Sequence, residues 1–274
     1  NQKAEVILYR PTGESGDFEK ANFPIGVEGG KTSTCPTQNL MEAYDMKDGT
    51  PFVWNNQSNP YDNRDPRMKY TIVCNEMKWP VDPVEIWEGG TNGLPLQNAT
   101  TTGYYLKKYV NNTISFEAGS TVTKKQHNWV LFRYGEILLN YAEAMINAFH
   151  DPNYKDAVYN MSAREAVNQI RGRTNISLPG FPSDITEKDF VKRLKNERRV
   201  ELAFEGHRFW DVRRWKELGQ TANIYGVKIT KNNEVISYEK FLLETRAVTD
   251  NMYFYPIPNT ERFKNQKLSQ KHRL

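Results

Sequence analysis

The segment 196–216 constrains the fold of this chain more than any other, because its sequence NERRVELAFEGHRFWDVRRWK combines dense charge with aromatic residues. Written as one helix, it places Glu197, Glu201 and Glu205 at four-residue intervals on a single face. Like charges at this spacing destabilise an isolated helix by roughly 0.2–0.5 kcal/mol per pair, so the glutamates need cationic partners. The segment therefore predicts a buried or half-buried ion-pair network that fixes helix packing. Its predicted members are Glu197, Arg198, Glu201, Glu205, Arg208 and Asp211.

Truncation of a network member should leave a buried charge without its partner. We therefore expect Glu205→Ala and Arg208→Ala each to lower stability by several kcal/mol. Gly206 is expected to cap or bend the helix. After this bend, Phe209 and Val212 are predicted to face inward. We call the segment 196–216 the signature. Its tryptophans, Trp210 and Trp215, are predicted to belong to the core.

Six further segments resemble, in order, the motifs of one known family. They are TQNL at 37–40, DMKDG at 45–49, RDPR at 64–67, RYGEILLNYAEA at 133–144, NQIRGR at 168–173 and YPIP at 255–258. Together with the segment 196–216, these motifs resemble the SusD/RagB family. Gly135 stands where that family usually has Ala, and it is expected to weaken its helix by up to about 1 kcal/mol.

The resemblance implies a surface lipoprotein of the outer membrane in Bacteroidetes-type bacteria. Such a protein binds glycans or other nutrients and sits as a lid on a SusC-type TonB-dependent transporter. It is a binding protein and not an enzyme. On this resemblance, residues 1–274 are interpreted as a C-terminal domain, whose N-terminal helical-repeat half, signal peptide and lipid anchor lie upstream. The anchor would be the only contact with the membrane.

Composition excludes several other classes of protein. No run of about 18 apolar residues occurs, so no transmembrane helix is predicted. The net charge of +4 comes from interspersed cations rather than a basic stripe, so nucleic acid is not a predicted partner. Cys35 and Cys74 could pair or remain free thiols. Because no CxxC motif or nearby histidine accompanies them, no zinc site is predicted, and no other metal or cofactor is expected.

The predicted fold class is mainly α, with a tetratricopeptide-like helical hairpin scaffold, long irregular loops and a few short strands. Residues 1–128 are loop-rich, with possible strands at 5–9 and 70–74. Residues 129–274 are predicted to be the helical region, which includes the signature. Within it, residues 219–250 are read as loop-like, and the chain ends in an extended YPIP segment and a polar tail.

The helical hairpin is predicted from apolar residues at three- and four-residue intervals. The first helix follows this spacing from Tyr134 and the second runs from about Ser162 to Gly172. A third helix, with Ser183 or Thr186 as its N-cap, is expected to continue into the signature.

Two neighbourhoods in the loop-rich region have the composition of a sugar-binding platform. In such a site an aromatic ring stacks on the apolar face of a sugar, and polar side chains bond the hydroxyls. The predicted ligand-binding residues are Trp54, Asn56 and Tyr61 in one neighbourhood and Trp87 and Asn92 in the other. The alternative for each tryptophan is a structural role, filling a small core under a loop; Trp79 is expected to be structural.

An enzymatic role is not predicted. A glycosidase needs two carboxylates on either side of a cleft, one of them able to act as an acid. The carboxylates of 196–216 alternate with arginines that would hold them ionised. No hydrolase, kinase or dinucleotide-binding motif appears. The alternatives to glycan binding are a carbohydrate-active enzyme that uses the same aromatic loops, and a peptide-binding or structural surface protein.

Overall fold

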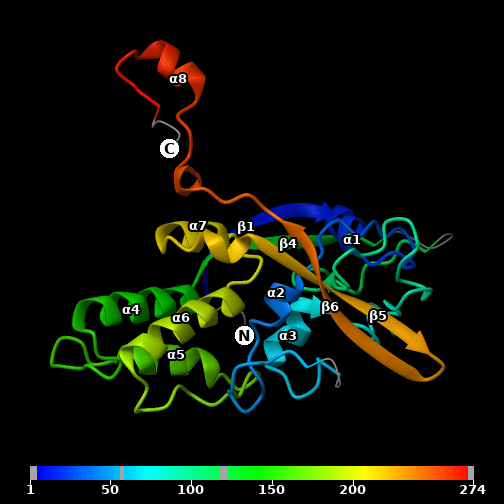
Figure 1. Cartoon of the computed structure of the whole chain (residues 1–274), viewed down its shortest axis with the longest axis horizontal. Helices are drawn as coiled ribbons and strands as arrows, with labels where there is room; N and C mark the ends of the chain where they lie inside the picture. Colours follow the sequence, from blue (N-terminus) through cyan, green and yellow to red (C-terminus); the bar gives the residue numbers. More distant parts are fainter. Residues whose placement is uncertain (1–4, 56–58, 118–122, 271–274) are drawn as a thin grey trace.

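The structure is a computed structural model that describes residues 5–55, 59–117 and 123–270 (Figure 1). Long loops dominate its first part. The elements there are β1 (Val6–Ser15), α1 (Asp17–Asn22), α2 (Gln38–Met41), α3 (Pro66–Thr71), β2 (Ile72–Val73), β3 (Tyr105–Leu106) and β4 (Lys125–Arg133). The second part contains α4 (Tyr134–Phe149), α5 (Ala163–Arg171), α6 (Glu187–Glu201), α7 (His207–Arg214), η2 (Leu218–Thr221), β5 (Asn223–Asn232), β6 (Val235–Thr245), η3 (Asp250–Tyr253) and α8 (Asn259–Lys264).

Helices α4, α5 and α6 lie together (Figure 1), and they share one apolar core. On α4, Leu138, Ala142 and Met145 recur at three- and four-residue intervals, which places them on one buried stripe. Phe190 at the start of α6 is completely buried against them. Both helices that periodicity predicts for the hairpin are confirmed. None of the described helices is long and apolar enough to cross a membrane.

The loop-rich part of the chain has a core of its own. Large aromatic side chains fill it, because each removes a large apolar area from water without requiring a regular element. Tyr44, Tyr104 and Tyr105 are completely buried, and Trp79 joins the same cluster, as its predicted structural role requires. Cys35 and Cys74 are both free thiols.

Each pair of strands forms a separate two-stranded antiparallel sheet. β1 pairs with β4 from Val6 opposite Arg133 to Ser15 opposite Lys125. The strand predicted at 5–9 is therefore real but longer, and its partner directly precedes the first long helix. The strand predicted at 70–74 is shorter, because α3 continues to Thr71 and leaves only two residues to β2.

The prediction that residues 219–250 form a loop is wrong. β5 and β6 are a hairpin of ten and 11 residues, paired from Asn223 opposite Thr245 to Asn232 opposite Val235. Val227 and Ile229 of β5 and Tyr238 of β6 are buried, because this face of the hairpin packs against the core of the loop-rich part. The hairpin thus extends alongside α2 (Figure 1).

The segment 196–216 is two helices rather than one. α6 ends at Glu201, and Gly206 adopts a left-handed conformation (φ +85°) as the residue before α7. The bend predicted at this glycine is confirmed. At the other end of α6, the hydroxyl of Thr186 accepts a hydrogen bond from the amide of Asp189 (3.2 Å), so Thr186 rather than Ser183 is the N-cap.

Ser162 begins α5 with a reciprocal cap. Its Oγ accepts a hydrogen bond from the Glu165 amide (3.1 Å), and Glu165 Oε2 accepts one from the Ser162 amide (2.8 Å). Ser162→Ala should lower the free energy of unfolding by about 1 kcal/mol. Urea unfolding followed by circular dichroism measures the change. Ser183→Ala is the matched control and should change stability by less than about 0.5 kcal/mol; equal losses in both variants would contradict the capping role.

Candidate functional site

Glu197 of α6 lies at the centre of a buried ion-pair network. Its two carboxylate oxygens bind Arg67 Nη1 (2.5 Å) and Arg171 Nη1 (2.7 Å). Arg67 also binds Asp65 (2.7 Å), the residue that caps its own helix α3. Because Arg171 is the last residue of α5, these pairs join α3, α5 and α6. All four side chains are at most 7% exposed.

Glu201, one turn further along α6, binds three arginines. Its carboxylate contacts Arg67 (2.9 Å), Arg133 (2.7 Å) and Arg173 (2.7 Å). Gly135 makes room for this arrangement, because a Cβ atom there would lie 2.6 Å from Arg133 Nη1. Since the glycine is in the first turn of α4, where amides lack helical partners anyway, the helix weakening expected from an interior glycine does not apply in full.

Glu205 extends the network beyond the end of α6. Its carboxylate binds Arg133 Nε (2.8 Å) and Lys108 Nζ (2.6 Å). Lys108 lies just after β3 in the chain. A second cluster lies on the other side of α6. There Asp211 of α7 binds Arg198 (2.8 Å) and Arg214 (2.9 Å). Together the two clusters connect α6 to α3, α5, β4 and α7 by charged pairs.

The arginines keep these glutamates ionised. Burial alone would raise the pKa of Glu201, but the guanidinium groups of Arg133 and Arg67 outweigh it and hold that pKa far below its ordinary value. Burial by itself would also raise the pKa values of Glu197 and Glu205. Their cationic partners outweigh this effect, so both pKa values are lowered. A carboxylate that stays ionised cannot serve as a general acid, so these residues have the properties of a scaffold.

Arg208 lies outside the network, contrary to the sequence prediction. Its Nη2 donates to Gln220 Oε1 (2.9 Å), and it forms no ion pair with any residue that the structure describes. The side chain points away because Gly206 starts a new helix with a different direction. We therefore expect Arg208→Ala to destabilise the protein much less than the network interpretation requires.

The two signature aromatic residues expected inside are also exposed. Val212 is buried as predicted, but Phe209 is 41% and Trp210 is 57% exposed. Their rings lie 5.0 Å apart, and both contact Tyr255 of the YPIP segment, at 5.9 and 5.8 Å. Trp215 is half-buried, and its ring nitrogen donates to a carboxylate of α4 (2.7 Å). The buried side chains of α7 are Asp211 and Val212, and its aromatic residues are not among them.

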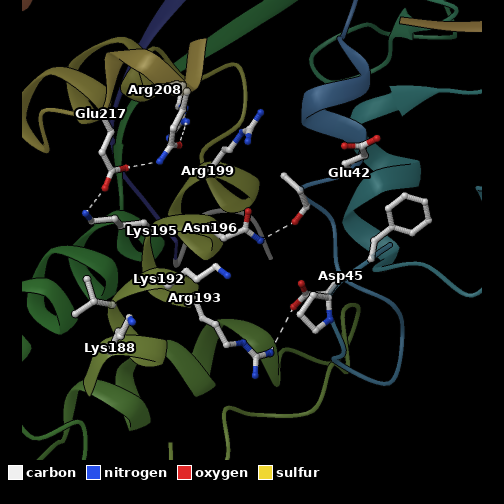
Figure 2. A pocket seen from close by; sticks show the side chains of 15 residues that line it. Glu42, Asp45, Lys188, Lys192, Arg193, Lys195, Asn196, Arg199, Arg208 and Glu217 are labelled. Carbon is white, nitrogen blue, oxygen red and sulfur yellow. Dashed lines mark hydrogen bonds and ion pairs between the residues drawn. The ribbon is translucent and has the colours of Figure 1, made fainter. Parts of the chain in front are cut away.

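An open crevice of about 450 Å³ separates α6 from the segment 42–52 (Figure 2). We call it the α6 crevice. One wall is the solvent-facing side of α6, and the other carries Glu42, Asp45 and Phe52. Asn196 of α6 ties the walls together, since its Nδ2 donates to the backbone oxygen of Ala43 (2.7 Å). This contact fixes the position of one wall of the crevice relative to the other.

Cations outnumber acids in the lining of the α6 crevice. The six cations are Lys188, Lys192, Arg193, Lys195, Arg199 and Arg208. The three acids each have a cationic partner: Glu42 binds Lys240 (2.8 Å), Asp45 lies 3.6 Å from Arg193, and Glu217 binds Lys195 (2.5 Å). Six positive minus three negative charges leave an excess of three. Of these cations, only Arg208 was a predicted site residue, although the four-residue spacing of Lys188 and Lys192 already places them on one helical face.

Aromatic residues border the crevice on the side opposite α6. Phe52 lines it, and the guanidinium of Arg64 stacks on the Phe52 ring at 3.7 Å. Trp54 packs edge-to-face on the same ring, with centroids 6.4 Å apart. Arg64 is fixed in turn by bonds to the backbone oxygens of Met41 and Tyr44 (both 2.7 Å). The predicted Trp54 neighbourhood therefore adjoins the α6 crevice.

The other predicted ligand-binding residues lie in different environments, and their role in binding stays a prediction. Tyr61 is 6% exposed and packs edge-to-face on two other tyrosines. The Trp87 ring lies under the ammonium of Lys231 (4.3 Å). Asn92 is buried, and its side chain bonds backbone groups of two other loop segments. Asn56 lies outside the described residues.

A second depression, of about 1060 Å³, opens beside the network. Tyr9 and Tyr70 lie at its surface, 50% and 56% exposed. The charged residues in its lining, such as Arg133 and Glu205, already bind one another. A ligand there would have to compete with these pairs, whereas the α6 crevice offers donors without carboxylate partners.

A sequence model described as the SusD family matches residues 6–272. The chain belongs to the SusD family. The resemblance predicted from the ordered motifs is thereby confirmed. Among curated relatives, SusD-like protein P2 of Formosa agariphila is 28% identical over 156 residues, which are 55% of this chain and 26% of that protein.

Solved structures agree with this membership of the SusD family. A SusD-like protein from Bacteroides fragilis NCTC 9343 superposes with a TM-score of 0.77 at 26% identity, covering 97% of this chain and 54% of that chain. A SusD-like carbohydrate binding protein from the same strain gives a TM-score of 0.75 at 24% identity, with the same coverage, and supports the fold alone. This chain thus spans about half of the length of these SusD-like structures.

Proposed function

We propose that this SusD-family protein binds oligosaccharides in the α6 crevice. The carrying observation is a crevice in which four of the six cations lack a carboxylate partner among the described residues, next to aromatic rings, in a chain of this family. A sugar ring has an apolar face that suits Phe52 and Trp54 and a rim of hydroxyls that suits amides and cations. The carbohydrate binding named for one solved relative supports this class of ligand.

The mechanism that we propose is capture and transfer. The protein works at the surface of the outer membrane and delivers its glycan to a SusC-type TonB-dependent transporter. In this scheme α4 and α5 serve as a tetratricopeptide-like scaffold, and the ion-pair network keeps the walls of the crevice in place. Co-purification with such a transporter in detergent tests the transfer step, and a protein that never associates with one would contradict it.

A glycan array with variants tests binding and its place together. We expect wild-type protein to bind a subset of the glycans. Trp54→Ala should weaken that binding roughly tenfold, equivalent to about 1.4 kcal/mol, because an aromatic surface beside the ligand is lost. Trp87→Ala is the matched control, since this tryptophan stacks on Lys231 rather than on Phe52.

The pattern of losses distinguishes the possible sites. Loss in Trp87→Ala with unchanged binding in Trp54→Ala would move the site to the other predicted neighbourhood. Loss only in Tyr70→Ala would assign the ligand to the depression beside the network. A well-folded protein that binds no glycan would refute the proposal.

A further inference from the structure

Two arginines of the α6 crevice, Arg199 and Arg208, have only neutral hydrogen-bond acceptors (Figure 2). Arg199 Nη2 donates to the backbone oxygen of Asn39 (2.8 Å), and Arg208 Nη2 donates to the Gln220 side chain (2.9 Å). Among the described residues, neither has a carboxylate within ion-pair distance. The network arginines, by contrast, each bind at least one carboxylate. The crevice therefore holds two guanidinium groups that form no direct ion pair with any carboxylate of the described residues.

The two charges also oppose each other. Burial, and then repulsion by the neighbouring Arg208, lower the pKa of Arg199 to about 10. Burial likewise lowers the pKa of Arg208. Both groups still carry a full charge at neutral pH. An oxyanion placed between them would relieve the repulsion and accept charge-assisted hydrogen bonds, which are roughly twice as strong as neutral ones.

Further along α6, Lys188 and Lys192 continue the positive surface. They lie one turn apart, are exposed and line the crevice. Within the described part of the chain, neither side chain makes an ion pair or a hydrogen bond. Because the acids in the lining bind other cations, they do not cancel these charges. Positive charge therefore runs from the exposed lysines to the arginine pair.

We propose that the α6 crevice selects acidic glycans, with a carboxylate or sulfate group of the sugar chain bound between Arg199 and Arg208. This inference rests on the proposed glycan-binding function and names its ligand class. The planar fork of an arginine binds two oxygens of such a group at once. Lys188 and Lys192 attract further anionic groups of the same chain, so affinity falls as salt screens these exposed charges.

Isothermal titration calorimetry with oligosaccharides of equal length tests the inference. Three sets are compared: neutral, uronate-containing and sulfated. We expect wild-type protein to bind an acidic set at least tenfold more tightly than the neutral set. Arg199→Gln and Arg208→Gln should each remove most of that preference. The double variant Lys188→Gln/Lys192→Gln should reduce it severalfold, and it changes only exposed side chains without described partners.

Arg213→Gln is the matched control, because this α7 arginine stacks on Phe209 at 3.5 Å outside the crevice. It should leave the preference unchanged, and melting curves verify that every variant folds. Equal affinity for neutral and acidic sets, or an unchanged preference in the variants, would overturn the inference while the glycan-binding function stands. Absence of binding to all three sets refutes the function itself. Equally tight binding of inorganic polyphosphate of matched charge would also overturn the inference, because no sugar is then recognised.

Discussion

Glu201→Gln is expected to lower the free energy of unfolding by about 3–5 kcal/mol, although it alters only one oxygen atom. The side chain is 3% exposed and binds three arginines, Arg67, Arg133 and Arg173. Removal of its charge leaves these guanidinium groups close together with fewer carboxylates to neutralise them. Glutamine offers a single acceptor oxygen and cannot replace the lost pairs. The melting temperature should fall by roughly 10 °C.

Guanidinium unfolding and thermal melts measure this loss. Glu261→Gln is the matched control, because Glu261 forms an exposed pair with Lys264 on α8. It should change stability by less than about 1 kcal/mol. If both variants melted within a degree of wild type, the network would not contribute to stability as its burial implies.

Stability is expected to fall steeply in acid, starting near pH 4.5. Glu197, Glu201 and Glu205 all have folded-state pKa values below the ordinary 4.5. The unfolded chain therefore takes up protons at a higher pH than the folded protein does. The stability that these carboxylates supply is complete above pH 4.5 and is lost as the pH falls through their folded-state pKa values.

Each proton that binds the unfolded chain but not the folded protein changes the free energy of unfolding by about 1.4 kcal/mol per pH unit. Three such protons give at most roughly 4 kcal/mol per pH unit. Asp45 acts in the opposite direction, because burial raises its pKa. Urea unfolding at pH 7, 5, 4 and 3.5 measures the slope. Glu201→Gln should show a smaller slope below pH 4.5 than wild type, and identical slopes would contradict the assignment.

The long helices were predictable because the signals that define them are local. The apolar stripe of α4 recurs within single turns, and the Ser162 and Glu165 cap spans four residues. The four-residue spacing of the glutamates also predicted the ion-pair network. Like charges at this spacing destabilise a helix unless cations lie close to them. The identity of those cations was not predictable from spacing: Arg67 is 130 residues away from Glu197.

The strands were harder for two different reasons. β1 and β4 pair across more than 100 residues, and neither strand is strongly alternating, since most of their side chains are exposed or half-buried. The β5–β6 hairpin, by contrast, carries a local signal. Buried Val227 and Ile229 alternate with polar residues ahead of the turn, and Asn233 takes the left-handed conformation that such turns favour. That region could have been assigned from the sequence.

The candidate site was only partly predictable. Trp54 was singled out by its polar neighbours and does adjoin the α6 crevice through Phe52. The wall of the crevice that α6 forms was not predicted. In the sequence its cations resemble those of an ordinary solvent-exposed helix face, and the opposite wall is known only from the structure. Arg208 was wrongly assigned to the ion-pair network, since the turn at Gly206 redirects its side chain.

The separation in sequence between the network partners makes the folding of the two parts of the chain interdependent. Arg67 precedes Glu197 by 130 residues, and Arg133 precedes Glu201 by 68. Without α6 and the turn that follows it, these arginines would keep only the carboxylates of Asp65 and Glu5 as partners. The loop-rich part is therefore expected to reach its final packing only once α6 is in place, because α6 and that turn supply the remaining counter-charges.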